Sequence, residues 1–307
     1  MKKEIINDIR LCEELWNQFS PNTSIWDLWK TVSSFYDPNI HELYFILIEE
    51  SGDRGLLPLY FDTDYQKHYF FGGGYPENRN FWFPIKMFSS FFEAMPEKTT
   101  LFDLKKSAVE SVTDLYPEYA QYFSEKDVKY GLDLNQINHD LDVFFQRFGK
   151  KHYKNLRNDL KAIEGIPYRL AWIQEKEGIE KLTSDLATFN IERFGKESDF
   201  TDNKTLREFE SLIQCFNQEG FLHTLTVTLN DKIVGIEMGA FFNGYYYVLN
   251  AGFDSSCKNL GKFMTLEHIK KSIELRAKEI DFLVGDTGWK QLWNLDIEPV
   301  YTFRKNT

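Results

Sequence analysis

The chain has 307 residues and a formal net charge of −11, with 36 Lys and Arg against 47 Asp and Glu. This acidic balance excludes a generally basic protein that coats nucleic acid through its bulk charge. The length predicts about two domains, and the apolar share of 42% excludes wholesale disorder.

No segment reaches the ~20 uncharged apolar residues of a spanning helix, so we expect a protein that is not integral to a membrane. Charged residues interrupt the N-terminal segment from Glu4 onward, which predicts that no secretory signal is present. The cysteines Cys12, Cys215 and Cys257 are far apart and lack metal-ligand spacing. They favour a reduced, cytoplasmic location with neither a disulfide framework nor a metal site.

The first half of the chain predicts a mixture of helices and strands. Its first forty residues predict two helices, and Ser24–Asp27 fits a capping box. Pro58 lies inside a predicted strand, which indicates an edge strand or a bulge. Phe70–Tyr75 predicts a tight turn, because the glycines of this segment match neither phosphate-loop pattern. Strands are predicted at residues 43–50, 55–61, 100–104 and 128–134.

A helix is predicted next, from about Leu141 to Ile163, with one apolar face. A second face carries basic residues at spacings of four, three and four: Lys150, Lys154, Arg157 and Lys161. We call these four residues the basic stripe. A solvated helix face and a phosphate-bearing partner both explain it.

The second half gives a regular order of elements. A strand and two helices come first, and the second helix ends at Gly220. Three strands follow, joined by the turns Asn230-Asp231 and Asn243-Gly244, which favour antiparallel hairpins. The predicted strands and helices lie at residues 168–173, 178–194, 206–219, 221–229, 232–242, 245–253, 266–277, 280–285 and 299–305.

This order resembles the acyl-CoA N-acyltransferase (GNAT) fold over about Pro167 to Thr307. In that fold, the turn after the fourth strand binds the cofactor pyrophosphate on backbone amides at the start of the next helix. Lys258 and Gly261 match the first two positions of the family pattern, whereas Phe263 stands where a small residue is usual. The resemblance therefore implies acyl-CoA binding by Ser255, Ser256, Lys258, Asn259, Leu260, Gly261 and Lys262.

Three blocks give a closer resemblance: the basic segment at 150–165, AGFD at 251–254, and DFLVGDTGWKQLW at 281–293. They resemble the FemAB-related branch, which includes CelD-like acetyltransferases and the C-terminal domain of phosphatidylglycerol lysyltransferases. In the CelD-like pattern of the last block, Asp281, Phe282, Gly285 and Lys290 fit, with Trp289 in place of Tyr.

The FemAB-related branch has two tandem GNAT-like domains joined at a long basic helix. The resemblance therefore implies an α/β fold of the α+β type with mixed, largely antiparallel sheets. We place the domains at residues 1–145 and 146–307, with a basic linking helix at 146–163 at the start of the second. The first would be a scaffold or the acceptor side, and the second would hold the donor.

Such a fold implies acyl transfer to an amine, which must lose a proton to attack. The candidate bases are Asp254, Asp286 and Glu237. Asp254 is equally explained as a loop cap, and Asp286 lies in a turn sequence, Gly-Asp-Thr-Gly. Glu237 is expected to face solvent, because strand residues alternate between faces. Lys290 would neutralise a phosphate or the oxyanion, or would be a solvated helix residue.

We therefore predict an enzyme that moves an acyl group, first of all acetyl, from acyl-CoA to an amine without a metal. The acceptor, a small molecule, lipid or peptide, would lie in the cleft between the halves. Two alternatives stay open. Aminoacyl-tRNA would be the donor if the basic stripe holds an RNA backbone, or the chain would be a non-catalytic binding module.

Overall fold

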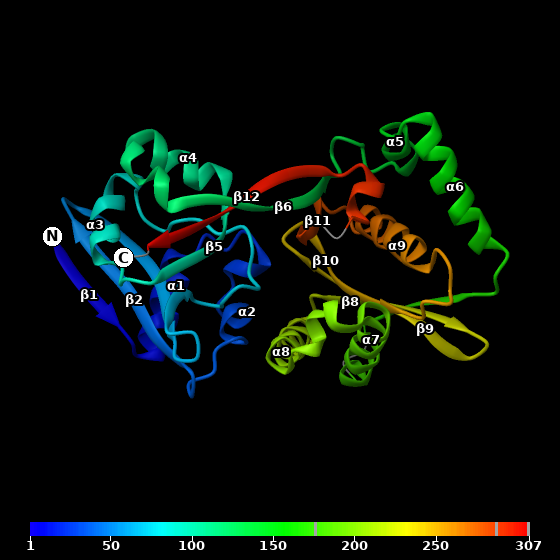
Figure 1. Ribbon diagram of the computed structural model, residues 1–307, viewed down its shortest axis with the longest axis horizontal. Helices are drawn as coiled ribbons and strands as arrows, with labels where there is room; N and C mark the ends of the chain where they lie inside the picture. The colour runs from blue at the N-terminus through cyan, green and yellow to red at the C-terminus, as the bar shows by residue number, and fades with distance from the viewer. Residues whose placement is uncertain (175–176, 286–287, 306–307) are drawn as a thin grey trace. The chain divides into compact units, whose positions relative to one another are not determined.

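The computed structural model describes residues 1–174, 177–285 and 288–305 (Figure 1). The chain forms two compact units. Unit 1 contains Met1–Lys129, a short segment from Val284, and the last strand from Ile297; unit 2 contains Tyr130–Leu283 and the segment that ends at Asp296. The boundary at residue 145 stays a prediction.

Unit 1 is built on a mixed sheet in the order β1-β2-β3-β4-β5-β12. Strands β4 and β5 are parallel. Four other neighbouring pairs are antiparallel: β1 with β2, β2 with β3, β3 with β4, and β5 with β12. The strands are β1 (Lys2–Ile6), β2 (His41–Glu50), β3 (Asp53–Asp62), β4 (Lys67–Phe70), β5 (Thr99–Lys105) and β12 (Asp296–Lys305).

Helices cover both faces of this sheet. Side chains of a strand point alternately to its two faces, and alternate residues of β2 belong to two different hydrophobic clusters. Phe45 and Leu47 pack with Trp16 of the first helix, whereas Ile46 and Ile48 pack with the cluster around the third helix. The helices of unit 1 are α1 (Ile9–Phe19), α2 (Trp29–Ser33), α3 (Phe88–Ala94) and α4 (Lys106–Leu115).

The structure changes several predictions in unit 1. Strands β1 and β4 were not predicted, and the capping box at Ser24 is confirmed but begins only a single 3-10 turn. The edge-strand interpretation of Pro58 is wrong, because β3 pairs on both sides. The ladder with β4 starts at Leu59, so Pro58 is not required to donate a hydrogen bond there, and its carbonyl accepts from Phe71 N–H at 2.9 Å. The glycine-rich tight turn is confirmed, with Gly72 at φ 95°.

The helix predicted from Leu141 to Ile163, and with it the linking helix at 146–163, is two helices. These are α5 (Leu141–Gln146) and α6 (Lys150–Glu164). The break has a physical cause, because the carbonyl of Arg147 accepts a hydrogen bond from Asn294 Nδ2 at 2.8 Å. The Arg147 guanidinium also pairs with Asp296. These side chains hold the residues between the helices, and α6 starts afresh at Gly149.

Unit 2 confirms the order of elements predicted for residues 168–285, and the last predicted strand, at 299–305, is part of β12 in unit 1. Its strands follow the order β6-β11-β10-β9-β8-β7, and β6 (Phe123–Asp133) begins in unit 1. Only β10 with β11 is parallel among the pairs described on this side. The elements are β7 (Arg169–Ile173), α7 (Ile179–Phe194), α8 (Asn203–Glu219), β8 (Leu222–Leu229), β9 (Lys232–Phe242), β10 (Tyr245–Phe253), α9 (Leu260–Glu274) and β11 (Glu279–Val284).

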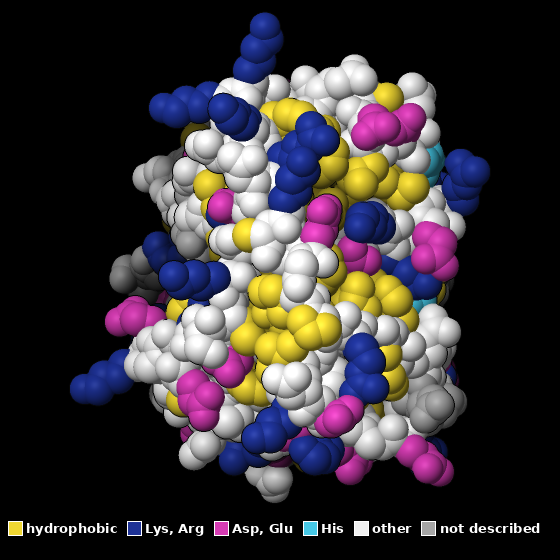
Figure 2. All heavy atoms as spheres, turned by 90° about the vertical axis from the view of Figure 1, so that its right-hand side faces the viewer, with side chains coloured by type: hydrophobic (Ala, Val, Ile, Leu, Met, Phe, Trp, Pro, Cys, Tyr) yellow, Lys and Arg dark blue, Asp and Glu magenta, His cyan; other side chains and the backbone are white. Residues whose placement is uncertain are grey.

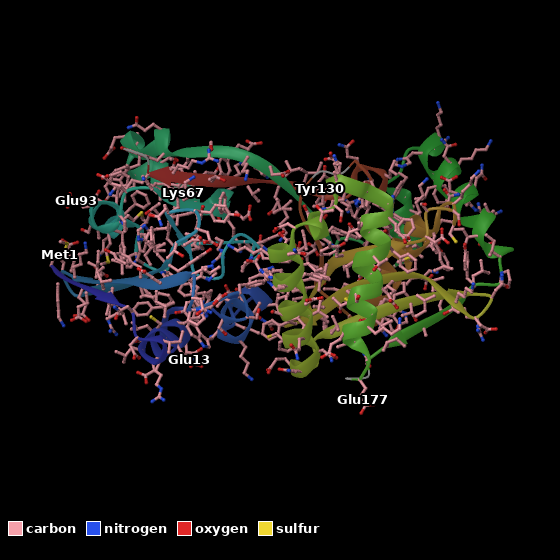
Figure 3. The ribbon with its side chains drawn as sticks, turned by 60° about the horizontal axis from the view of Figure 1, so that its bottom comes forward. Met1, Glu13, Lys67, Glu93, Tyr130 and Glu177 are labelled. Atoms are coloured by element: carbon pink, nitrogen blue, oxygen red, sulfur yellow. The ribbon has the colours of Figure 1, made fainter. Side chains whose placement is uncertain are left out.

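The sheet of unit 2 lies between α7 and α8 on one face and α9 on the other (Figures 1 and 3). Two glycines allow this close packing. A Cβ on Gly252 would lie 2.2 Å from the Leu186 carbonyl of α7, and one on Gly235 would lie 2.8 Å from Met264 Sδ of α9. The predicted α/β class with mixed, largely antiparallel sheets is confirmed. Within the described residues, no helix is long and apolar enough to cross a membrane.

Candidate functional site

Strands β10 and β11 run together and then separate. Their ladder extends from Tyr245 paired with Glu279 to Tyr247 paired with Asp281. Beyond this point β10 continues to Phe253, but the described residues give no further pair with β11. The register of β10 against β9 also shifts just after Val248, which marks a bulge. The part of β10 beyond Tyr247 is therefore not paired with β11 among the described residues.

The turn after β10 leads directly into α9. The Asp254 carboxylate accepts the Ser256 N–H at 2.8 Å, and bonds from the hydroxyl and the N–H of Ser256 lower the pKa of Asp254. Asp254 thus caps the turn, as one of the two interpretations expected. Asn259, at φ 63°, begins α9 without capping it through its side chain. The Leu260 N–H donates to the Cys257 carbonyl at 3.2 Å, whereas the amides of Gly261 and Lys262 have no partner among the described residues and are left for a ligand.

An arginine that the sequence analysis missed lies beside this turn. Gly261 packs under the Phe253 ring, where a Cβ would lie 2.6 Å from a ring carbon. The guanidinium of Arg193, from the end of α7, lies 4.1 Å from the centroid of the same ring. It has no acidic partner among the described residues. No local sequence signal identifies Arg193, because only the fold brings α7 next to the end of β10.

Three predicted cofactor residues have side chains that are engaged elsewhere. The side chain of Leu260 is fully buried in the core below α9. Lys262 Nζ donates to Asp159 Oδ2 of α6 at 2.5 Å, and Asn259 Nδ2 donates to the Asp159 carbonyl at 3.4 Å. The charge of Lys262 is therefore neutralised by α6. Ser255, Ser256 and Lys258 remain exposed.

The basic stripe lies on the exposed side of α6. All four of its side chains are exposed, and none has an acidic partner within the described part of the chain. Figure 2 shows the side of the molecule on which α6 lies, where Lys and Arg side chains project beside hydrophobic patches. The stripe is thus available to a polyanion.

Lys290 lies at the end of β11 rather than in solvent. It is only 6% exposed, and Nζ donates to the Leu283 carbonyl at 3.0 Å. Nζ also lies 5.6 Å from the centroid of the Tyr130 ring. The solvated-helix interpretation of Lys290 is therefore wrong. Asp286, the predicted base near this lysine in sequence, lies outside the described residues.

Comparisons with known proteins agree with this geometry. Residues 150–291 match the family model described as Acetyltransferase (GNAT) domain. The structure of FemX is similar over 98% of this chain and 96% of its own, with a TM-score of 0.61 and 13% identity. The chain has a FemAB-like GNAT fold. The resemblance predicted from sequence is thereby confirmed as to fold.

Two other solved structures share this GNAT fold. L-PGS from Bacillus licheniformis has a TM-score of 0.52 and 11% identity, over 98% of this chain and 93% of its own. The C-terminal domain of a putative lysylphosphatidylglycerol synthetase from Agrobacterium fabrum has a TM-score of 0.54 and 8% identity, over 97% and 93%. No curated protein matches the sequence.

Glu237 is buried in the GNAT core instead of facing solvent. It is 3% exposed, because α9 covers the face of β9 that was expected to be open. Glu237 Oε2 lies 3.7 Å from His268 Nε2, and His268 Nδ1 lies 2.9 Å from the Tyr246 hydroxyl. Burial raises the pKa of Glu237 to about 8 and lowers that of His268 to about 3. Both are neutral at pH 7, so their contact is not an ion pair.

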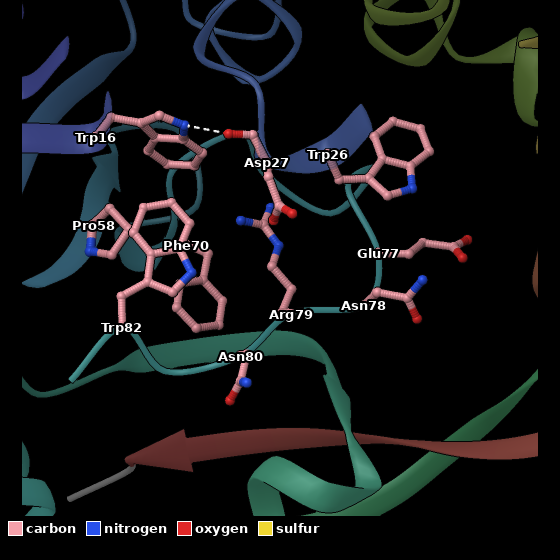
Figure 4. Close-up of a pocket in the computed structure, with 10 residues that line it drawn as sticks. All are labelled: Trp16, Trp26, Asp27, Pro58, Phe70, Glu77, Asn78, Arg79, Asn80 and Trp82. Atoms are coloured by element: carbon pink, nitrogen blue, oxygen red, sulfur yellow. Dashed lines mark hydrogen bonds between the residues drawn. The ribbon is translucent and has the colours of Figure 1, made fainter. Parts of the chain in front are cut away.

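Unit 1 contains a small polar cavity of about 20 Å³, enough for one water molecule (Figure 4). Its lining includes Trp16, Asp27 and Arg79. The Arg79 guanidinium donates to the backbone carbonyls of Phe71, Gly73 and Pro76, so it holds the glycine-rich turn. We assign this arginine a structural role. The described residues contain no group of His, Cys, Asp and Glu suited to a metal ion.

Proposed function

We propose that unit 2 transfers an acyl group from a bound donor to an amine. The observation that carries this proposal is the separation of β10 from β11 beside an α9 N-terminus without a side-chain cap. The amine nitrogen attacks the acyl carbonyl carbon, and the bond from that carbon to the donor sulfur or oxygen breaks. The amine proton passes to a base, and the products are an amide and the free thiol or hydroxyl of the donor.

We assign acyl-CoA as the first donor, with its phosphates at the start of α9. The first-turn amides and the exposed Lys258 would bind them, and Arg193 would add a second positive charge. The reaction would take place in the cytoplasm, as predicted from sequence.

Asp286 remains the proposed base. The other two candidate bases, Asp254 and Glu237, are less suited to accept the amine proton. The Asp254 carboxylate is hydrogen-bonded within its turn, and Glu237 is neutral and buried below α9. Lys290 would place a positive charge near the end of β11, where it would stabilise the oxyanion or a phosphate.

Acetyl-CoA and CoA at millimolar concentration are expected to raise the melting temperature. At ~100 times its Kd a ligand adds about 2.7 kcal/mol, which corresponds to roughly 5 °C. Differential scanning fluorimetry measures the shift, and the Arg193→Ala variant should reduce it. If neither ligand shifts wild type, acyl-CoA is not the donor.

A second donor, aminoacyl-tRNA, is favoured by a specific observation. The basic stripe is exposed and has no acidic partner among the described residues, whereas Asp159 places a negative charge against Lys262 at the start of α9. The unneutralised positive charge therefore lies on α6, while Lys262 of α9 is neutralised, so a polyanion such as tRNA would bind along α6. The presence of lysylphosphatidylglycerol synthetase structures among the fold neighbours agrees with an aminoacyl donor.

We expect tRNA binding to weaken steeply with salt, because phosphate contacts release counterions. Changing the whole basic stripe to glutamine should lower the slope of log K against log salt by about one for each cation removed. A control with the exposed Lys67, Lys98 and Lys105 changed to glutamine should keep the slope of wild type. Salt-insensitive binding would contradict the RNA assignment. Loss of both CoA and tRNA affinity in folded protein would leave the non-catalytic module.

A further inference from the structure

The side chain of Asn250 lies at the bulge of β10, in the half of the strand that has separated from β11. It is the first residue after the register shift and lies beyond Tyr247, the last residue paired with β11. Asn250 faces α7, because its oxygen accepts a hydrogen bond from Asn190 of that helix. Glu237 pairs with Ala251, the next residue, and lies on the opposite, α9 face.

Two hydrogen bonds fix the orientation of the Asn250 amide. Its Oδ1 accepts from Ala251 N–H at 2.8 Å and from Asn190 Nδ2 at 3.3 Å. An oxygen must occupy this position, since both partners are donors. The Nδ2 group therefore takes the other position. It has no hydrogen-bond partner within the described part of the chain, and the side chain is half-buried rather than enclosed in the core.

Asn190 is itself held firmly. It is 8% exposed, its Nδ2 also donates to the Ala251 carbonyl at 3.1 Å, and its Oδ1 accepts from Ser198 Oγ at 2.7 Å. Ser198 is 4% exposed and lies in the segment between α7 and α8. The network thus joins three parts of unit 2 and explains the position of Asn250 Oδ1. It makes no use of Asn250 Nδ2.

We propose that Asn250 is a catalytic residue whose Nδ2 donates a hydrogen bond to the acyl oxygen as the tetrahedral intermediate forms. Asn190 is the positioning residue that aims it. This inference rests on the proposed function. A donor that is already oriented stabilises a developing oxyanion without reorganisation, and its removal typically costs about 10²–10³ in kcat. Nucleophilic attack turns the acyl C=O into C–O⁻. The C=O bond forms again when the bond from the acyl carbon to the donor sulfur or oxygen breaks.

The Asn250→Asp variant separates the catalytic role from the structural one. Aspartate keeps an oxygen for Ala251 and Asn190 but replaces the free Nδ2 donor by a second oxygen. We expect kcat to fall about 100-fold or more, while the melting temperature and the shift caused by the donor stay close to wild type. Asn250→Ala, which brings no negative charge, should lose a similar factor.

Asn190→Ala should lower kcat more than it raises KM for the donor, because Asn250 would lose its orientation but not its donor group. The assay measures product formed from the donor that shifts the melting temperature, acetyl-CoA or lysyl-tRNA, with a lysine peptide, glucosamine and ethanolamine as amines. If the wild-type protein forms no product, both the proposed function and this inference are overturned. Active wild type with kcat of both Asn250 variants within threefold overturns this inference alone.

Discussion

Replacing Lys290 by methionine is expected to lower kcat for acyl transfer by about 100-fold or more, with donor binding retained. The ammonium group is buried at the end of β11 and donates to the Leu283 carbonyl. There it meets a low-dielectric surrounding in which a positive charge stabilises a developing oxyanion strongly. Methionine keeps most of the volume of the side chain and removes only the charge and the donor.

The melting temperature tests whether this loss is catalytic. The Leu283 carbonyl would lose a donor, which costs about 1–3 kcal/mol for a buried group, so a modest decrease is expected. Lys270→Met is the matched control, because Lys270 lies on the exposed side of α9 in a surface pair with Glu267. It should leave both kcat and stability near wild type. A Lys290→Met protein that turns over within threefold of wild type would remove Lys290 from the mechanism.

The order of elements in the second half was predictable because its signals are local. Asn243-Gly244 adopts positive φ at both positions, and Gly220 ends α8 in the left-handed region, as their sequences indicate. Strand β4 was not predicted, because it has only four residues and its strand conformation depends on pairing with β3 and β5. The break before α6 depends on Asn294, more than a hundred residues away, and no local pattern contains it.

The candidate site was predictable as a loop and a strand end, but not as a set of side chains. The family pattern predicted Lys258, Gly261 and Lys290 as site residues, because it records residue types that recur at fixed positions. It did not show that Asp159 would neutralise Lys262 from another helix. Asn250 was missed because an asparagine in a strand has no distinctive spacing. The role that we propose for it rests on a bulge and on Asn190, sixty residues earlier.

Glu237→Gln is expected to stabilise the protein increasingly as the pH rises from about 5 to about 8. In the folded protein, burial raises the pKa of Glu237 from 4.5 to about 8. The unfolded chain therefore loses this proton above pH 4.5, while the folded protein keeps it until about pH 8. The unfolded state binds fewer protons in this window, so wild type loses about 1.4 kcal/mol of stability per pH unit at this residue. Glutamine does not titrate and escapes that loss.

The difference between variant and wild type isolates Glu237 from the other groups around it. His268, Tyr246, His223 and Lys271 all lie near this buried cluster. Burial lowers the pKa of His223 to about 4 and of His268 to about 3, so both cost stability as the pH falls below 6.5. Both histidines are present in the variant too, and their contribution largely cancels in the difference.

Melting temperatures measured at pH 5, 6, 7 and 8 should therefore diverge steadily, with the variant higher at the alkaline end. Glu274→Gln is a suitable control, because that side chain is 67% exposed and pairs with Lys271. A constant offset between Glu237→Gln and wild type across this range would show that Glu237 is already ionised in the folded protein. His268 would then have to carry the matching positive charge, and the cluster would be a buried ion pair.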